Sequence, residues 1–193
     1  MSTNTYAAIK MNSGAETFDD IVISGCTFTN YYQGVYIQNG NDVQVLNNVI
    51  DGTTHNAIAL QANVQGKIDI EENIIKNCAD RAIRFGNAGA VESILIENNV
   101  MVDSGSSSDF ISGSGLFKAD SLPADDAVSL EYNYWAGKTA SEAVGNASVR
   151  PANTGIIGGT FIEDVEAYKA IGYTVADNGD GTYTVVPISD TIS

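Results

Sequence analysis

The stretch that decides the fold is Ile68–Met101, IDIEENIIKNCADRAIRFGNAGAVESILIENNVM, which contains two copies of one pattern. Each copy reads apolar–x–apolar, two spacer residues, Asn, x and apolar. The copies are IVISGCTF from Ile21, VQVLNNVI from Val43, IDIEENII from Ile68, ILIENNVM from Ile94 and VSLEYNYW from Val128. They start 22 to 26 residues apart, with a longer interval before the last. Short alternating strands at this period cannot each bury a face alone, so we expect units stacked on one continuous core.

Two columns of equivalent positions run through these copies. The first is an asparagine column, in which Cys26 takes the slot of the first copy: Cys26, Asn48, Asn73, Asn99 and Asn133. The second is a following short strand, found as GVYI at Gly34, AIAL at Ala57 and AIRF at Ala82, with AAIKM at Ala7 as a matching half-copy. Alternation points the apolar residues of both strands inward. We expect the asparagines to point inward as well and to form a ladder, because a buried amide left unpaired costs roughly 1–3 kcal/mol.

This column pattern resembles the right-handed parallel β-helix repeat of pectate-lyase-like proteins, in which stacked inward asparagines form a ladder at one turn. The Leu-x-x-Leu-x-Leu frame of leucine-rich repeats is absent, and the Gly, Asn and β-branched content disfavours helical repeats. We therefore predict an all-β fold, a short right-handed parallel β-helix of about five coils with a small α+β C-terminal cap. The expected boundaries are 1–136 for the repeats, whose first coil is incomplete, 137–153 for a connecting segment and 154–193 for the cap.

The segment from Gly155 reads GIIGGTFIEDVEAYKAIGYTVADNGDGTYTVVP. Thr160 and Glu163 have the spacing of a capping box, and helical spacing continues through Val165, Tyr168 and Ile171, so a helix ending before Gly172 is expected. A hairpin is expected from 173–175 and 182–186. This segment resembles a unit of bacterial surface proteins that often follows β-helix repeats. Because the end of a β-helix exposes unpaired backbone edges, we expect the segment to cover that end.

The composition excludes several partners. Among 193 residues, 24 are Asp or Glu and 9 are Lys or Arg, which gives a net charge of −15. This balance argues against nucleic acid, whose backbone requires clustered Lys and Arg. No apolar run approaches the ~20 residues of a membrane helix, so we expect no membrane insertion. The first residues lack the basic and apolar regions of a secretion signal, whereas the resemblance implies an extracellular or cell-surface protein.

The two cysteines are expected to be free. Cys26 and Cys78 lie two coil steps apart in the predicted stacking. At about 4.8 Å per step their Cα atoms would be about 10 Å apart, which is beyond the reach of a disulfide. We expect both to be largely buried.

Catalytic candidates are sparse. Enzymes of this fold class use outward strand positions, where a lyase needs a base beside Ca²⁺-binding carboxylates and a hydrolase needs two facing carboxylates. The outward column of the first strand is Val22, Gln44, Asp69, Leu95 and Ser129, with a single carboxylate. Arg81 and Arg84 lie near Asp80 and could act as a base and its partner. The alternative interpretation is an ion pair on the surface of the coil. The weak catalytic candidates are therefore Asp69, Arg81 and Arg84.

Two other groups of residues suggest contacts. A sugar-stacking surface is predicted where aromatic rings lie beside amides, at Tyr31, Tyr32, Tyr36, Asn39 and Asn41, although these rings could instead cover the β-helix. A second outward column is unexpectedly apolar: Val49, Ile74, Val100 and Tyr134. Such a stripe indicates that something packs over it. The 101–127 insertion, the C-terminal segment and a partner are all candidates.

No cofactor and no metal site are predicted. Acidic loops at Asp19-Asp20, Asp125-Asp126 and Asp177–Gly181 offer oxygen ligands for Ca²⁺, but the last lacks the downstream Glu of an EF-hand. His55, the only histidine, is expected at the surface. We predict a non-catalytic, adhesin-like or scaffold module of a bacterial surface protein that presents a β-helix face to a glycan or to a host or neighbouring protein. The alternative is a fragment of a polysaccharide lyase or glycoside hydrolase.

Overall fold

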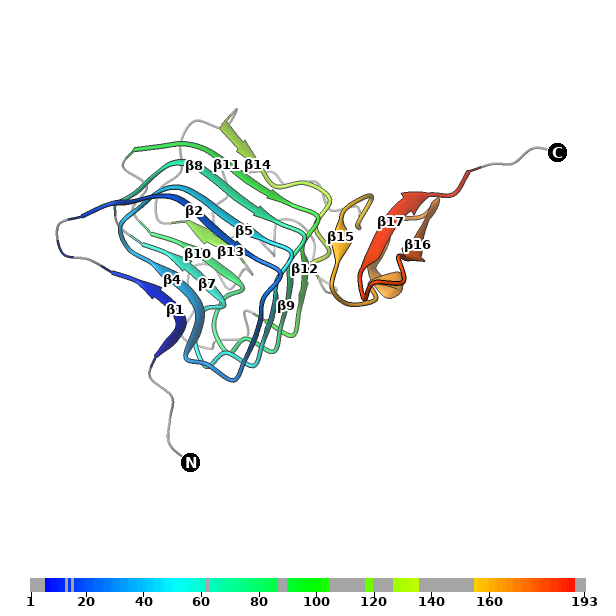
Figure 1. The fold of residues 1–193 in the computed structure, drawn as a ribbon, viewed down its shortest axis with the longest axis horizontal. Coiled ribbons are helices and arrows are strands. Elements are labelled where there is room, and N and C mark those ends of the chain that lie inside the picture. Colours follow the sequence, from blue (N-terminus) through cyan, green and yellow to red (C-terminus); the bar gives the residue numbers. More distant parts are fainter. Residues whose placement is uncertain are drawn as a thin grey trace.

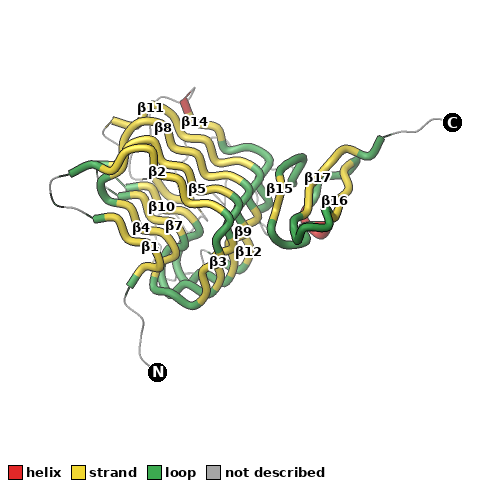
Figure 2. The backbone as a smooth tube through the Cα atoms, viewed as in Figure 1, coloured by secondary structure: helices red, strands yellow, loops and turns green. Residues whose placement is uncertain are grey.

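The computed structural model describes residues 6–12, 14, 16–61, 63–86, 90–104, 117–119, 127–135 and 155–189. Its first part is a parallel β-solenoid of about four turns, close to the predicted five, with the C-terminal segment beside it (Figure 1). Figure 2 shows strands and loops in both parts, with only short helical turns. The described part of the chain contains no helix whose length and apolar character would let it span a bilayer.

Three parallel sheets form the solenoid, and neighbours in each sheet come from successive coils. Sheet A contains β1 (Ala7–Met11), β4 (Gln33–Ile37), β7 (Ile58–Leu60), β10 (Ile83–Phe85) and β13 (Phe117–Ala119). Sheet B contains β2 (Phe18–Ser24), β5 (Gly40–Leu46), β8 (Val64–Glu71), β11 (Ala90–Glu97) and β14 (Val128–Ser129). Sheet C contains β3 (Thr27–Thr29), β6 (Val49–Asp51), β9 (Ile74–Lys76) and β12 (Val100–Val102).

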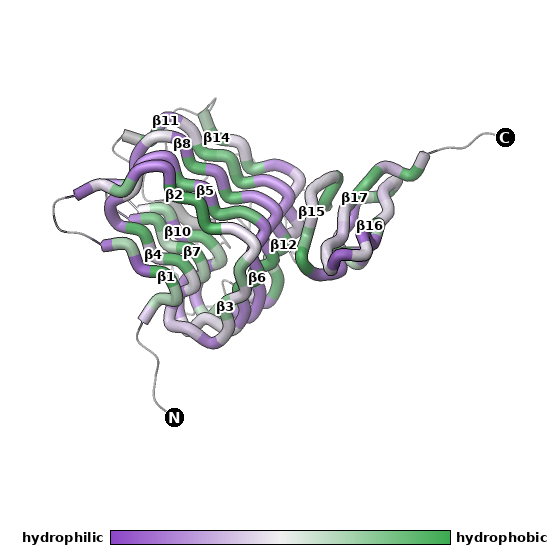
Figure 3. The backbone as a smooth tube through the Cα atoms, viewed as in Figure 1, coloured by the Kyte–Doolittle hydropathy of each residue, from purple (hydrophilic) through white to green (hydrophobic). Residues whose placement is uncertain are grey.

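The register keeps each apolar column in line. In sheet B, Val43 pairs with Ile21 on one side and Ile68 on the other, and Ile68 pairs with Ile94. The half-copy at Ala7 also takes its predicted place, because β1 pairs with β4 through Ile9 and Val35. The predicted inward positions are buried except Val128, which is partly buried, and Figure 3 shows apolar bands that cross successive strands. Alternation in the sequence therefore predicted the core of the solenoid.

The asparagine ladder is confirmed. The side-chain Oδ1 of each asparagine accepts a hydrogen bond from the backbone N–H one rung earlier: Asn48 from Cys26 at 2.9 Å, Asn73 from Asn48 at 3.0 Å, Asn99 from Asn73 at 2.9 Å and Asn133 from Asn99 at 3.0 Å. Each Nδ2 donates to a backbone carbonyl of the preceding coil, as Asn73 does to Val45 at 2.8 Å. The four asparagines are completely buried. Since every amide bonds one coil to the next, the ladder fixes the stacking register.

Both cysteines are free, as predicted. Cys78 is buried, and burial raises the pKa of its thiol. Cys26 is only partly buried and directly precedes β3, the edge strand of sheet C.

The C-terminal segment is an antiparallel sheet with the strand order β15 (Thr160–Phe161), β17 (Tyr183–Pro187) and β16 (Tyr173–Asp177). The predicted hairpin of β16 and β17 is confirmed. The predicted helix is wrong, because only Glu166–Tyr168 form a short 3₁₀ turn and Thr160 pairs with Thr184 in the sheet. Gly159, at a φ of 99°, turns the chain into β15, so the residues with helical spacing are used in a strand and a turn.

This segment packs against the outer face of sheet C, beside the solenoid. Its Ile156, Phe161, Val165 and Val185 form a second apolar cluster with the outward column Val49, Ile74 and Val100. The stripe that predicted a covering element is thus covered by the C-terminal segment itself. The described contacts lie on the flank of the coils, whereas the sequence led us to expect cover over the end. Contact on the flank removes the apolar column of sheet C and the apolar residues of the segment from water together.

Candidate ligand-binding site

The predicted tyrosine and asparagine surface is not assembled as one face. Tyr31 packs against the solenoid core. Asn39 is buried, and its Oδ1 accepts a hydrogen bond of 2.8 Å from Asn63. The ring centroids of Tyr32 and His55 are 5.0 Å apart. Tyr36 lies on sheet A, and the Lys10 ammonium is 5.7 Å from its ring centroid. The fifth residue, Asn41, donates to the carboxylate of Asp42 at 3.2 Å.

Of the three predicted catalytic residues, Arg84 lies in β10 of sheet A and Arg81 just before this strand, whereas Asp69 lies on sheet B. Arg81 donates to both carboxylate oxygens of Asp80, at 3.2 and 3.3 Å, and its side chain is only 2% exposed. The ion pair is therefore buried, where a surface pair was expected. His55, expected at the surface, lies partly buried with its Nδ1 2.7 Å from Asp80. Arg84 lies on sheet A in register with Ala59, and Asp69 lies on sheet B. These residues do not converge on one reaction centre.

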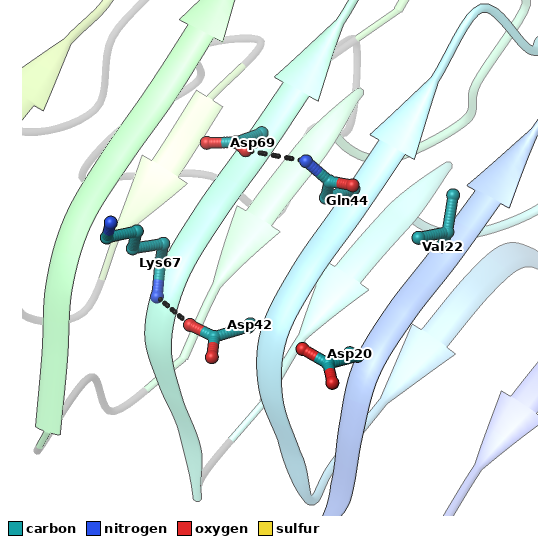
Figure 4. A pocket seen from close by; sticks show the side chains of 6 residues that line it. All are labelled: Asp20, Val22, Asp42, Gln44, Lys67 and Asp69. Atoms are coloured by element: carbon teal, nitrogen blue, oxygen red, sulfur yellow. Dashed lines mark hydrogen bonds between the residues drawn. The ribbon is translucent and has the colours of Figure 1, made fainter.

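Asp69 instead belongs to a shallow pocket of about 220 Å³ on the outer face of sheet B. Two residues from each of three consecutive strands line it: Asp20 and Val22 from β2, Asp42 and Gln44 from β5, and Lys67 and Asp69 from β8. Figure 4 shows these six side chains side by side on neighbouring strands. The pocket is thus a direct product of coil stacking.

The two rows of the pocket have different origins. Val22, Gln44 and Asp69 occupy paired positions of neighbouring strands and form the outward row that the sequence predicted. Asp20 and Asp42 lie two residues upstream, and both adopt left-handed backbone, with φ of 51° and 54°. The register of β5 and β8 shifts between Asn41 and Val43, so a bulge places Asp42 beside β8.

Gly66 makes this bulge possible. Its φ is 72°, and a Cβ at this position would collide with Oδ1 of Asp42. In its absence, that oxygen accepts a hydrogen bond of 2.8 Å from the backbone N–H of Lys67. Sequence reasoning missed Asp20, Asp42 and Lys67 as partners of Asp69. Alternation is consistent with an outward position for all three, but left-handed backbone and a bulge decide how they are placed, and these features leave only a weak signal in the sequence.

The polar atoms of the pocket are only partly used within the chain. Gln44 Nε2 donates to Asp69 Oδ2 at 3.0 Å, and both oxygens of Asp42 accept bonds from Asn41 and Lys67. Within the described residues, neither Asp20 nor the Lys67 ammonium has a hydrogen-bond or ion-pair partner. These free groups can contact a ligand without breaking an existing bond.

Negative charge increases along the same face. Glu71 follows Asp69 by two residues and pairs with Glu97 of the next coil. Burial raises the pKa of Glu71 above its usual 4.5, and the nearby Asp69, Glu72 and Glu97 add to this increase. The outer face of sheet B is therefore strongly acidic.

No group of three or more His, Cys, Asp or Glu residues among those that the structure describes is arranged to hold a metal ion. In the 177–181 turn, Asp177 accepts from the Gly179 N–H and Asp180 accepts from Thr182, which also lowers the pKa of Asp180. Asp125 and Asp126 lie outside the described residues.

The parallel sheets, the one-coil offset between neighbouring strands and the inward asparagine ladder together define a right-handed parallel β-solenoid. Residues 1–120 match the family model described as "Right handed beta helix region". Because this match covers more than half of the chain, the protein belongs to the right-handed β-helix family. Comparison with curated proteins and with solved structures finds no match.

Proposed function

We propose that this chain is a non-catalytic, extracellular module of the adhesin or scaffold type, and that it presents the outer face of sheet B to a glycan. The observation that carries the proposal is the pocket formed by Asp20, Val22, Asp42, Gln44, Lys67 and Asp69. Three consecutive coils hold this pocket on a rigid sheet, so a ligand would meet a surface that is already formed. Preorganisation of this kind lowers the entropic cost of binding.

The chemistry of the pocket suits a sugar. The side chain of Val22 is exposed and offers an apolar contact for the C–H face of a sugar ring, with Val22 58% exposed as a whole. The amide of Gln44 and the carboxylates around it accept hydrogen bonds from hydroxyl groups. The outer face of sheet C, by contrast, is occupied by the C-terminal segment. Sheet B is therefore the better candidate for a binding face.

The extracellular assignment rests on other evidence. It is supported by the net charge of −15, by the resemblance of the repeats to pectate-lyase-like proteins and by the resemblance of the C-terminal segment to a unit of bacterial surface proteins. A host or neighbouring surface protein is the other partner that such a face could bind.

A polysaccharide lyase or glycoside hydrolase is the second candidate. The observation that favours it is the grouping of three carboxylates and one lysine in the same pocket, since cleavage of a glycosidic bond uses carboxylates or a base beside them. Binding is the stronger proposal because the chain itself occupies both oxygens of Asp42, and Asp69 is hydrogen-bonded to Gln44.

One experiment separates the two candidates. The protein is incubated with neutral, amino and acidic polysaccharides, with and without calcium, and both retention on the polysaccharide and release of soluble oligosaccharides are measured. We expect retention without release, and weaker retention for an Asp20→Asn/Asp69→Asn variant. Asp180→Asn is the matched control, because it removes a charge from the C-terminal segment and keeps an oxygen acceptor for Thr182.

Each other outcome has a clear meaning. Release by the wild type but not by the double variant would assign catalysis to the pocket. A protein that is retained on no polysaccharide would contradict glycan binding and leave a protein partner or a structural role. Equal retention of both variants would place the binding site elsewhere on the chain.

A further inference from the structure

We propose that the glycan recognised by the sheet B pocket carries free amino groups. This inference rests on the function proposed above and assigns the substrate class of the same site. It derives from two properties of the pocket, the balance of its charges and the hydrogen-bonding atoms that it leaves available.

The charge balance favours a cationic ligand. Three carboxylates and one ammonium line the pocket, and the next outward row adds Glu71 and Glu97. The remainder of the chain adds to this field, since the net charge is −15. Complementary charge steers and orients a partner, whereas like charges facing each other disfavour binding. An amino sugar therefore fits this face, and an acidic sugar is repelled by it.

The available atoms favour the same class. Once the internal bonds of Asp42, Asp69 and Gln44 are made, the groups of the pocket that have no partner among the described residues are Asp20, Oδ1 of Asp69, Oε1 of Gln44 and the ammonium of Lys67. All except the ammonium are acceptors at neutral pH. A ligand must therefore supply mostly donors. Hydroxyl and ammonium groups do so, but the carboxylates of acidic sugars add further acceptors.

The effect of removing Lys67 distinguishes a cationic ligand from an acidic one. Among the described residues, Lys67 is the only cationic group that lines the pocket, and it forms no ion pair with Asp20 or Asp69. If the ligand were acidic, Lys67 would anchor it and its removal would abolish binding. If the ligand carries amines, Lys67 opposes it, and Lys67→Gln strengthens binding.

The experiment compares two oligosaccharides with the same backbone. Tetramers of glucosamine and of N-acetylglucosamine are titrated into the full chain by calorimetry at low salt, with oligogalacturonate, with and without calcium, as the acidic probe. We expect the glucosamine tetramer to bind about tenfold more tightly than its acetylated counterpart. We expect an Asp20→Asn/Asp69→Asn variant to lose about fivefold, Lys67→Gln to gain about twofold, and added salt to remove the difference.

The alternative outcomes are distinguishable. Equal affinity for the two tetramers would overturn this inference and leave the proposed glycan binding intact. Preferential binding of oligogalacturonate, lost in Lys67→Gln or dependent on calcium, would also overturn it. If no probe or polysaccharide binds, the proposed function fails together with the inference. Circular dichroism melting of each variant is the control for loss of the fold. We expect melting close to the wild type, because the side chains of Asp20, Lys67 and Asp69 lie on the outer face.

Discussion

The outer faces of sheets B and C are made by the same coils and differ completely. Sheet C presents the column Val49, Ile74 and Val100, which is buried under the C-terminal segment. Sheet B presents Val22, Gln44 and Asp69, which line an open pocket. The inward residues of both sheets pack in one core and must be apolar. The outward residues are not under this constraint, so they can differ between the two sheets. The difference teaches that an apolar outer column in a β-helix indicates intramolecular cover, whereas a polar one marks surface that is free for a ligand.

The largest expected effect tests which face is covered. Ile74 is 4% exposed between the solenoid and the C-terminal segment, so Ile74→Asp would bury an unpaired carboxylate. We expect a loss of about 3–5 kcal/mol in the free energy of unfolding, measured by urea denaturation. Val22→Asp, the matched substitution on the open face, should change it by less than about 0.5 kcal/mol. Similar losses in both variants would mean that the two faces do not differ in burial.

The sequence predicted the solenoid well because a repeated constraint leaves a repeated signal. Asparagines at one slot, such as Asn73 and Asn99, can be recognised because every coil needs the same amide bonds. The C-terminal segment has no such repetition. There, Val165 and Tyr168 have helical spacing but serve to contact the apolar column of sheet C, which is distant in the sequence. Tertiary packing therefore overrode a local pattern that was consistent with a helix.

The second prediction concerns the ladder that holds both faces in register. Asn73→Ala would leave the carbonyl of Val45 and the backbone N–H of Asn48 buried without their present partners. Each such group costs roughly 1–3 kcal/mol, so we expect a loss of about 2–4 kcal/mol and a clearly lower melting temperature. Gln44→Ala, on the outer face of the preceding coil, is the control and should melt close to the wild type. An unchanged melting temperature for Asn73→Ala would contradict the assigned ladder.

The pocket was only half predictable. Alternation placed Asp69, Gln44 and Val22 on the outer face, but the positions of Asp20 and Asp42 depend on left-handed backbone, and that of Asp42 also depends on the bulge and on space above Gly66. Such features arise from contacts between coils and leave a weak local signal. For the tyrosines, the sequence left open whether the rings bind a ligand or cover the β-helix, and Tyr31 packs against the solenoid core.

A third, smaller effect is expected where the two parts of the chain meet. Lys76 of sheet C donates to Glu163 of the C-terminal segment at 3.0 Å, and both side chains remain partly exposed. Exposed ion pairs of this kind contribute about 0–1 kcal/mol, so Lys76→Met should destabilise by about 0.5 kcal/mol at low salt and by less at high salt. A double-mutant cycle with Glu163→Gln measures the coupling. A coupling above about 2 kcal/mol would show that this pair, rather than the apolar cluster, holds the segment in place.

The smallest expected effect is a gain in stability, whereas the substitutions above reduce it. The pKa of Glu71 is raised in the folded state, so the native protein binds this proton more tightly than the unfolded chain does. The resulting stabilisation is present below the unfolded value near 4.5 and is lost as the pH rises through the higher, folded-state pKa. Glu71→Gln should therefore raise the melting temperature slightly at pH 7 and leave it unchanged in acid. A lower melting temperature at pH 7 would mean that ionised Glu71 stabilises the fold.

The most direct test of the central claim is a ligand titration followed by two-dimensional NMR of the isotopically labelled chain. Titration with the glycan that binds most tightly should shift the backbone amide signals of Asp20, Gln44 and Asp69, on the outer face of sheet B. The signals of Ile74 and Val100, under the C-terminal segment, should stay in place. Shifts confined to sheet A, to sheet C or to the C-terminal segment would contradict the assignment of sheet B as the binding face.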